Sequence, residues 1–119
     1  MNKYHSRKIT RDGEVFDSIK EYRRYCELKL LEKAGEIHDL ERQVKFLLVP
    51  AQYESPETDE KGHRRRGKLA EREISYYADF VYYRGNMLVV EDAKGIRTKE
   101  YIIKRKLMRY FLGIKVVEK

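Results

Sequence analysis

The sequence predicts an α/β (α+β) fold in which a central mixed β-sheet is flanked by helices, in the order α-β-β-β-α-β. Three observations predict it. Two strand-like runs joined by a tight turn occupy the middle of the chain, a helical pattern lies on each side of them, and a short apolar run follows the second helix. A strand that follows a helical crossover can pair in parallel with the strand before the helix. At 119 residues, the chain is expected to form one domain, residues 1–119.

The central strands are predicted within residues 74–94. Residues 74–83 are aromatic and β-branched, and residues 87–90 are apolar. Gly85 and Asn86 lie between them, and both residue types tolerate the positive φ of a hairpin turn. This pattern indicates a β-hairpin.

The hairpin brings two carboxylates together. If Gly85-Asn86 is a two-residue loop, Arg84 pairs with Met87 and Asp79 lies opposite Asp92. A three-residue loop would instead place Asp79 opposite Glu91. Asp79 faces a carboxylate in either register. The sequence therefore predicts a carboxylate pair but leaves open whether Asp92 or Glu91 is its second member.

Facing carboxylates repel each other unless a cation binds between them, and hard oxygen ligands at this spacing suit Mg²⁺ or Mn²⁺. Alternation places Asp92 and Lys94 on the face toward Asp79, and Glu91 on the other face, where we expect a structural role. A metal lowers the pKa of bound water, and a lysine beside it can orient that water or neutralise developing charge. The competing interpretation is a pair of surface acids on an edge strand.

The first helix is predicted over residues 19–34, with Ser18 and Glu21 as a capping box and Gly35 at its end. The capping box alone would account for Glu21. The buried stripe, which would make Cys26 a core residue, is predicted at helical spacing on Ile19, Tyr22, Cys26, Leu30 and Ala34, and Tyr25, Leu28 and Leu31 widen it.

Other segments are predicted from alternation and breakers. Residues 36–40 form a connection, and residues 43–49 form a strand with Val44, Phe46 and Leu48 on one side. Residues 53–72 contain Pro, Gly and charges of both signs, which indicates a mobile charged loop or an extended hairpin tip. Residues 1–15 form a basic N-terminal arm. A second helix over residues 99–112 and a strand over residues 114–117 complete the chain.

The charge favours nucleic acid as the partner. The formal net charge is +7, and the last 26 residues hold nine Lys or Arg against two Glu. Ordinary solvated charges are the competing interpretation for each single residue. The candidate contacts lie in the 53–72 segment and the second helix: Arg64, Arg65, Arg66, Lys99, Tyr101, Lys104, Arg105 and Arg109.

Several classes of protein are excluded by composition. One cysteine permits no intrachain disulfide, and three scattered histidines lack zinc-ligand spacing. No apolar signal-peptide core and no run of about 20 apolar residues is present. We therefore expect a cytoplasmic protein without a membrane partner.

The residues at the carboxylate pair resemble the PD-(D/E)xK nuclease superfamily. That superfamily places an Asp on its second core strand and a D/E-x-K tripeptide on its third, which Asp79 and Asp92-Ala93-Lys94 match. Many members carry a Glu on the first helix, which Glu21 matches. The chain departs from the pattern in having Ala78, and not Pro, before Asp79.

Nearly the whole chain also resembles a family of short phage and prophage proteins of uncharacterised function within that superfamily, similar to Holliday junction resolvase-like endonucleases. The likeness is carried by six stretches: Asn2-Lys3-Tyr4, Phe16-Asp17-Ser18, Glu27-Leu28-Lys29-Leu30-Leu31, Gln43, Tyr77-Ala78-Asp79-Phe80 and Asp92-Ala93-Lys94-Gly95.

The resemblance implies a restriction-endonuclease-like core and DNA cleavage that depends on Mg²⁺ or Mn²⁺, in a bacterial cell carrying the phage or prophage. It implies that Asp79, Asp92 and Glu21 bind the metal, that Lys94 positions the attacking water, and that Gln43 supports the site. The expected form is a homodimer acting on branched DNA, such as Holliday junctions, in recombination or replication. The alternatives are a non-catalytic nucleic-acid-binding module and an accessory protein of phage replication.

Overall fold

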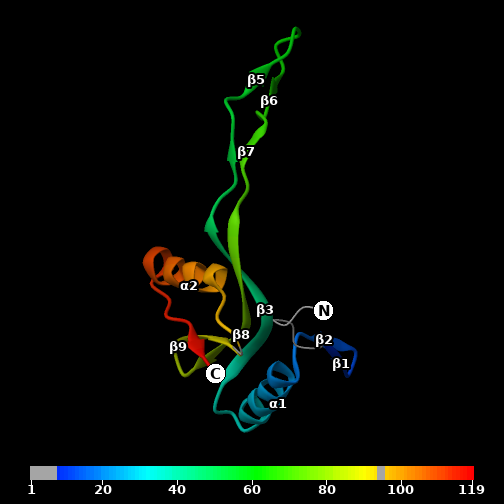
Figure 1. Cartoon of the computed structure of the whole chain (residues 1–119), viewed down its shortest axis with the longest axis vertical. Coiled ribbons are helices and arrows are strands. Elements are labelled where there is room, and N and C mark those ends of the chain that lie inside the picture. Colours follow the sequence, from blue (N-terminus) through cyan, green and yellow to red (C-terminus); the bar gives the residue numbers. More distant parts are fainter. Residues whose placement is uncertain (1–7, 94–95) are drawn as a thin grey trace.

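The structure, a computed structural model, describes residues 8–93 and 96–119 as a body with a long projecting arm (Figure 1). Two helices and ten strands are defined in this part of the chain. In chain order they are β1 (Ile9–Arg11), β2 (Glu14–Phe16), α1 (Ile19–Lys33), β3 (His38–Val49), β4 (Gln52–Tyr53), β5 (Glu57–Thr58), β6 (Arg64–Arg65), β7 (Leu69–Glu71), β8 (Ile74–Arg84), β9 (Met87–Asp92), α2 (Lys99–Leu112) and β10 (Val117–Glu118).

The body is a mixed α+β structure around a four-stranded sheet with the order β10-β9-β8-β3. The strands β3, β8 and β9 pair antiparallel, and β10 pairs parallel with β9 after the crossover through α2. The prediction of a last, parallel strand is confirmed. The strand is Val117–Glu118, which is shorter and later than the predicted 114–117.

The turn between β8 and β9 has two residues. Arg84 pairs with Met87, and Gly85 adopts a left-handed φ of 61°. The ladder continues to the pair Phe80 and Glu91. The two-residue loop is therefore confirmed, and the register brings Asp79 next to Asp92.

The two helices cover opposite faces of the sheet. Val81 and Val90 are a cross-strand pair in the hydrophobic cluster that contains Tyr101 and Met108 of α2. The neighbouring pair, Tyr82 and Val89, belongs to the cluster that contains Leu28 of α1. Since neighbouring residues of a strand point to opposite faces, α1 and α2 lie on opposite sides.

Helix α1 buries only the widening part of the predicted stripe, Tyr25, Leu28 and Leu31, and exposes most of its predicted centre. Ile19 and Leu30 are 51% and 69% exposed, and Cys26 is exposed, so the prediction that these residues form the core stripe is wrong. Both stripes are apolar at helical spacing, and the helix pattern alone does not distinguish them. Aromatic packing decides: the Tyr25 ring stacks on Phe80 of β8 at 6.3 Å between centroids. The sheet-facing side holds Glu21, Tyr25, Leu28 and Leu31.

Strand β3 begins at His38, so the prediction that residues 36–40 are a connection is wrong beyond Ile37, which is buried. The predicted side chains Val44, Phe46 and Leu48 do pack on the cluster beneath α2. The strand is not regular, because Gln43 has a left-handed φ of 50°. The irregularity lies directly across from Asp79, between the pairs Val44–Ala78 and Arg42–Phe80.

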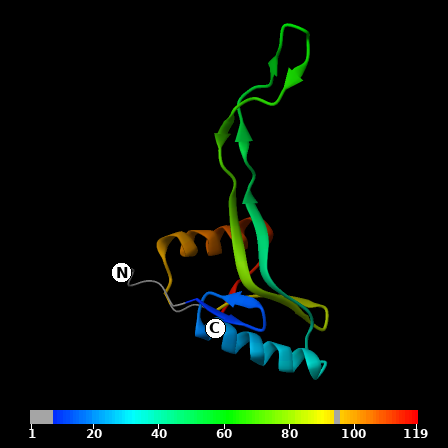
Figure 2. The same cartoon turned by 90° about the vertical axis from the view of Figure 1, so that its right-hand side faces the viewer.

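Residues 53–72 form an extended hairpin, the second of the two predicted alternatives. The strand pairs β4–β7 and β5–β6 continue away from the body on the side opposite α1 (Figures 1 and 2). The Cα radius of gyration is 18.9 Å, against about 14 Å for a compact domain of this length. The arm accounts for this elongated shape.

The described part of the N-terminal segment forms a small hairpin. Strands β1 and β2 pair around a turn at Asp12 and Gly13. The predicted basic arm (1–15) coincides with this hairpin from Ile9 on, and residues 1–7 lie outside the described residues. Neither described helix is long and apolar enough to cross a bilayer.

We predict that Leu28→Ala destabilises the protein by about 2–5 kcal/mol, because a fully buried leucine leaves a cavity beneath α1. The matched control is Leu30→Ala on the same helix, which should change the free energy of unfolding by less than about 0.5 kcal/mol. Urea denaturation followed by circular dichroism measures both. Equal effects would contradict the assignment of the buried stripe.

Candidate metal centre

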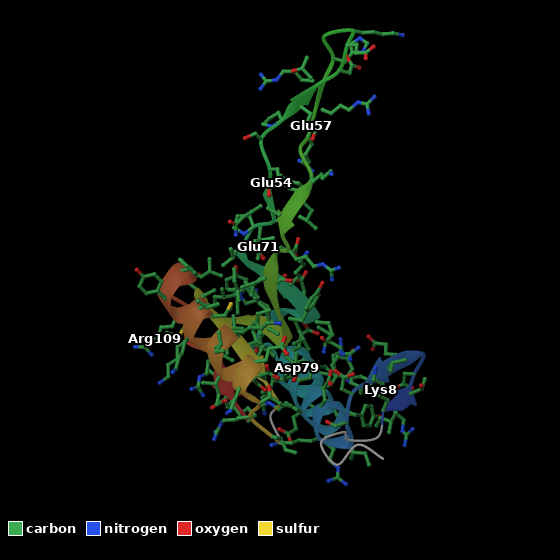
Figure 3. The ribbon with its side chains drawn as sticks, turned by 45° about the horizontal axis from the view of Figure 1, so that its top comes forward. Lys8, Glu54, Glu57, Glu71, Asp79 and Arg109 are labelled. Carbon is green, nitrogen blue, oxygen red and sulfur yellow. The ribbon has the colours of Figure 1, made fainter. Side chains whose placement is uncertain are left out.

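Three elements of the body converge at Asp79, which lies in the middle of β8 (Figure 3). Helix α1 contributes Glu21 from its first turn, strand β3 contributes Gln43, and the end of β9 contributes Asp92. Burial here is deep for carboxylates, since Glu21 is 2% and Asp92 is 1% exposed. The four residues come from distant parts of the chain and meet at one place.

Gln43 links two of the carboxylates. Its side-chain Nε2 donates to Oε1 of Glu21 and to Oδ1 of Asp79, each at 3.1 Å. The left-handed backbone of Gln43 is unusual for a residue other than glycine, and such strain is maintained where the surroundings determine it. The amide therefore holds two acids in one geometry.

Asp79 and Asp92 interact directly. Burial, together with the neighbouring Asp92 carboxylate, raises the pKa of Asp79 to about 7. Two hydrogen bonds oppose this effect, from Gln43 and from the backbone N–H of Ala93, which donates to Oδ2 of Asp79 at 2.9 Å. The pair stores electrostatic repulsion that a cation would relieve.

Glu21 has a capping role and a site role together. The backbone N–H of Glu21 donates to Oγ of Ser18 at 3.1 Å, as the capping box predicts. Its carboxylate turns inward and accepts from the backbone N–H of Asp17 and from the side chains of Arg42 and Gln43. Burial and the Asp79 charge raise the pKa of Glu21, while its hydrogen bonds lower it.

Asp92 is held from the α2 side of the sheet. The hydroxyl of Tyr76 donates to Oδ2 of Asp92, and burial beside this carboxylate raises the pKa of Tyr76. Lys94, predicted to position water, lies outside the described residues.

Glu91 points to the other face, as the alternation predicts. It is fully buried, and Arg24 of α1 donates to it from Nε at 2.5 Å and from Nη2 at 3.1 Å. The Tyr82 hydroxyl donates to the same carboxylate at 2.6 Å. Both oxygens are therefore engaged in a structural ion pair that attaches α1 to the end of β9, one residue before Asp92.

Asp17 is a site residue that the sequence analysis did not single out. Oxygen atoms of Asp17, Glu21 and Asp79 all lie within 4.8 Å of one another. The sequence did contain a signal for Asp17, because this residue directly precedes the helix cap and lies one helical turn before Glu21. Arg42 was also missed, and its Nη2 donates to Glu21 at 3.2 Å.

The donor set fits a small hard cation. Mg²⁺ and Mn²⁺ prefer carboxylate oxygens, and Mg²⁺ binds them at about 2.1 Å. Oxygens on one such ion lie at most about 4.2 Å apart, so the three-acid cluster would need to contract only slightly. Asp17, Glu21 and Asp79 form this cluster and would hold the ion, and Asp92, which adjoins Asp79, would complete the predicted ligand set.

The predicted nucleic-acid contacts are scattered. The prediction that Tyr101 contacts nucleic acid is wrong. Tyr101 is 6% exposed and belongs to the hydrophobic core, so its ring cannot stack on a base. Lys104 pairs with Glu100 at 2.9 Å, and Arg105 pairs with Glu118 at 3.5 Å. The remaining candidates are exposed on the surface: Lys99 and Arg109 on α2, and Arg64, Arg65 and Arg66 on the arm.

Over residues 1–116 the chain matches the family described as "Protein of unknown function (DUF1064)", and it therefore belongs to that family. Neither the curated proteins nor the solved structures include a significant match.

We predict that Arg24→Met destabilises the fold by about 3–5 kcal/mol, because it leaves the Glu91 charge buried without its partner. Arg23→Met, at the exposed neighbouring position, is the control and should be nearly neutral. The double variant Arg24→Met/Glu91→Gln should recover part of the loss. Denaturant midpoints measure all three, and an Arg24 effect as small as that of Arg23 would refute the anchoring role.

The raised pKa of Asp79 predicts a pH-dependent stability. In the folded protein this pKa is about 7, above the ordinary 3.8 of the unfolded chain. Protonation therefore favours the fold at low pH, and this contribution is lost as the pH rises toward and through 7. In EDTA, the free energy of unfolding should fall between about pH 4 and pH 8 more steeply in the wild type than in Asp79→Asn. Parallel curves for the two proteins would contradict the prediction.

Proposed function

We propose that this member of the DUF1064 family is a metal-dependent DNA endonuclease with a restriction-endonuclease-like core. The observation that carries the proposal is the convergence of Asp79, Asp92, Glu21 and Gln43, each a candidate from sequence, at one site in which Glu21 and Asp92 are buried. Buried acids that repel one another are costly in a structural core. A divalent cation bound at this site would offset that cost, because it neutralises the repulsion between the acids.

In the proposed site, Asp79 and Asp92 would hold Mg²⁺ or Mn²⁺, and Glu21 would bind the ion either directly or through a water molecule. The metal would supply Lewis-acid stabilisation of the phosphate and a water of lowered pKa. Gln43 keeps Glu21 and Asp79 together, and Tyr76 orients Asp92 through its hydroxyl. The resemblance assigns to Lys94 the positioning of the attacking water.

The proposed substrate is DNA, with branched forms such as Holliday junctions favoured in a phage or prophage setting. The positive charge of the last 26 residues supports a polyanionic substrate. We propose a homodimer, because one compact site reaches one strand at a time. The proposed location is the bacterial cytoplasm.

The test is cleavage of labelled four-way junction, flap, duplex and single-stranded DNA, with Mg²⁺, Mn²⁺ or EDTA. We expect metal-dependent cutting, with a rate at least about 100-fold lower in Asp92→Ala and in Lys94→Ala. The matched control is Glu41→Gln, which changes an exposed acid on the same strand as Gln43 and should leave the rate unchanged. Cutting that persists in Asp92→Ala would reject this site, and binding without cutting under every metal would favour the non-catalytic module.

A second readout does not depend on activity. Mg²⁺ should raise the melting temperature at pH 8, because the ion relieves repulsion between Asp79 and Asp92 and binds only the folded state. The increase should be absent in Asp79→Asn and present in Glu41→Gln. An equal increase in all three proteins would indicate metal binding elsewhere.

A further inference from the structure

The arm, defined as residues 50–73, has no hydrophobic core of its own. All residues of its strands β4 to β7 are exposed, and Gly67 is its one buried residue. A two-stranded ribbon by itself is only marginally stable in water. A ribbon of this length is therefore suited to lie against another molecule.

The arm is nevertheless a defined shape. Gly67 lies against the opposite strand so closely that a Cβ at this position would come within 2.2 Å of the carbonyl oxygen of Glu54. The next residue, Lys68, accepts from the backbone N–H of Glu54 at 2.8 Å. Since only glycine permits this approach, a side chain at position 67 would push the two strands apart between the inner and outer halves of the arm.

The tip is also ordered. Oδ1 of Asp59 accepts from the backbone N–H groups of Lys61 and His63, at 2.9 and 2.8 Å. Gly62 supplies the left-handed φ of 84° that the turn requires. A tip with these contacts holds the two strands in register at the far end.

The two edges of the arm carry opposite charge. The outgoing strand contains Glu54, Glu57, Asp59 and Glu60 and no cation, whereas the return strand has an excess of cations, with Lys61, Arg64, Arg65, Arg66, Lys68 and Arg72 against Glu71 and Glu73 near its base. Within residues 8–93 and 96–119, the cations of the return strand form no ion pair with a carboxylate. Arg66 lies over the Tyr53 ring at 4.4 Å. Apart from this cation–π contact, the cations of the return strand are exposed and available to phosphates.

We propose that the arm lies in the major groove of duplex DNA that flanks the reacting phosphate, with its basic edge along one phosphate strand. The major groove, about 12 Å wide, admits a two-stranded β-ribbon. Each arm strand, at about 12 residues and 3.3 Å per residue, spans roughly 40 Å, slightly more than one helical turn of DNA. The acidic edge gives the arm one orientation, because like charge keeps that edge from the phosphates.

This inference rests on the proposed function for the location of the duplex. It adds that the substrate must contain an uninterrupted duplex of about one helical turn or more beside the cut. Branched DNA with long arms satisfies this requirement, whereas short or single-stranded DNA does not.

The test compares four-way junctions whose duplex arms are about 8 or about 25 base pairs long, with Ca²⁺ replacing Mg²⁺. We expect wild type to bind the long-armed junction at least 10-fold more tightly. An arm-shortened variant, with residues 50–73 replaced by Asn-Gly between the paired Val49 and Ile74, should bind both junctions equally. Dimethyl sulfate footprinting should show protection of guanine N7, a major-groove atom, by wild type alone.

Two further variants separate shape from charge. Gly67→Ala keeps every charge and should lose the footprint on the outer part of the duplex. The triple variant Arg64→Ala/Arg65→Ala/Arg66→Ala should reduce the slope of log affinity against log salt by about 2–3. Its matched control removes three exposed cations of the body, Arg23, Lys33 and Arg84, and should leave the N7 footprint intact.

The outcomes distinguish this inference from the proposed function. Equal binding of the long-armed junction by wild type and the arm-shortened variant, without N7 protection, would overturn the inference even if cleavage occurs. Loss of a dimer in the arm-shortened variant, seen by light scattering without a change in DNA binding, would overturn it in favour of a second copy of the chain. Arm-dependent binding without cleavage under any metal would leave the inference standing and reject the nuclease. Circular dichroism and thermal melting establish that each variant is folded.

Discussion

The register between β8 and β9 is the constraint on which the structure depends. A two-residue turn sets it at one end, and the Arg24–Glu91 ion pair holds it at the other. Because side chains alternate along a strand, this register sends Glu91 to α1 and Asp92 toward Asp79. A slip of one residue would exchange the two acids, placing Glu91 beside Asp79 and removing it from Arg24.

The candidate site is costly to the fold, and the surrounding contacts offset part of the cost. Asp79 lies beside another buried carboxylate, which raises its pKa to about 7. Gln43 adopts a left-handed backbone while its amide contacts both Glu21 and Asp79. Donors from Ala93, Arg42 and Tyr76 satisfy carboxylate oxygens around them. Unfavourable features of this kind concentrate where a protein binds or reacts.

The body and the arm are held in shape by different interactions. In the body, helices cover both faces of the sheet, and burial determines which residues face inward. In the arm, no layer covers the strands, and their shape depends on backbone contacts at Gly67 and on the turn at Asp59. The shape of the arm is therefore determined by local backbone contacts, and its surface stays exposed, where another molecule can bind.

Local patterns in the sequence determined the central hairpin, its two-residue turn, the carboxylate pair, the helix cap at Ser18, and the parallel last strand. These features depend on neighbours in the chain or on strict alternation, which the sequence contains. Only the tertiary structure decided which apolar stripe of α1 is buried, that Tyr101 belongs to the core, and that Asp17 and Arg42 join the site. Those outcomes depend on contacts between distant elements, and two equally apolar helix faces differ only in what packs against them.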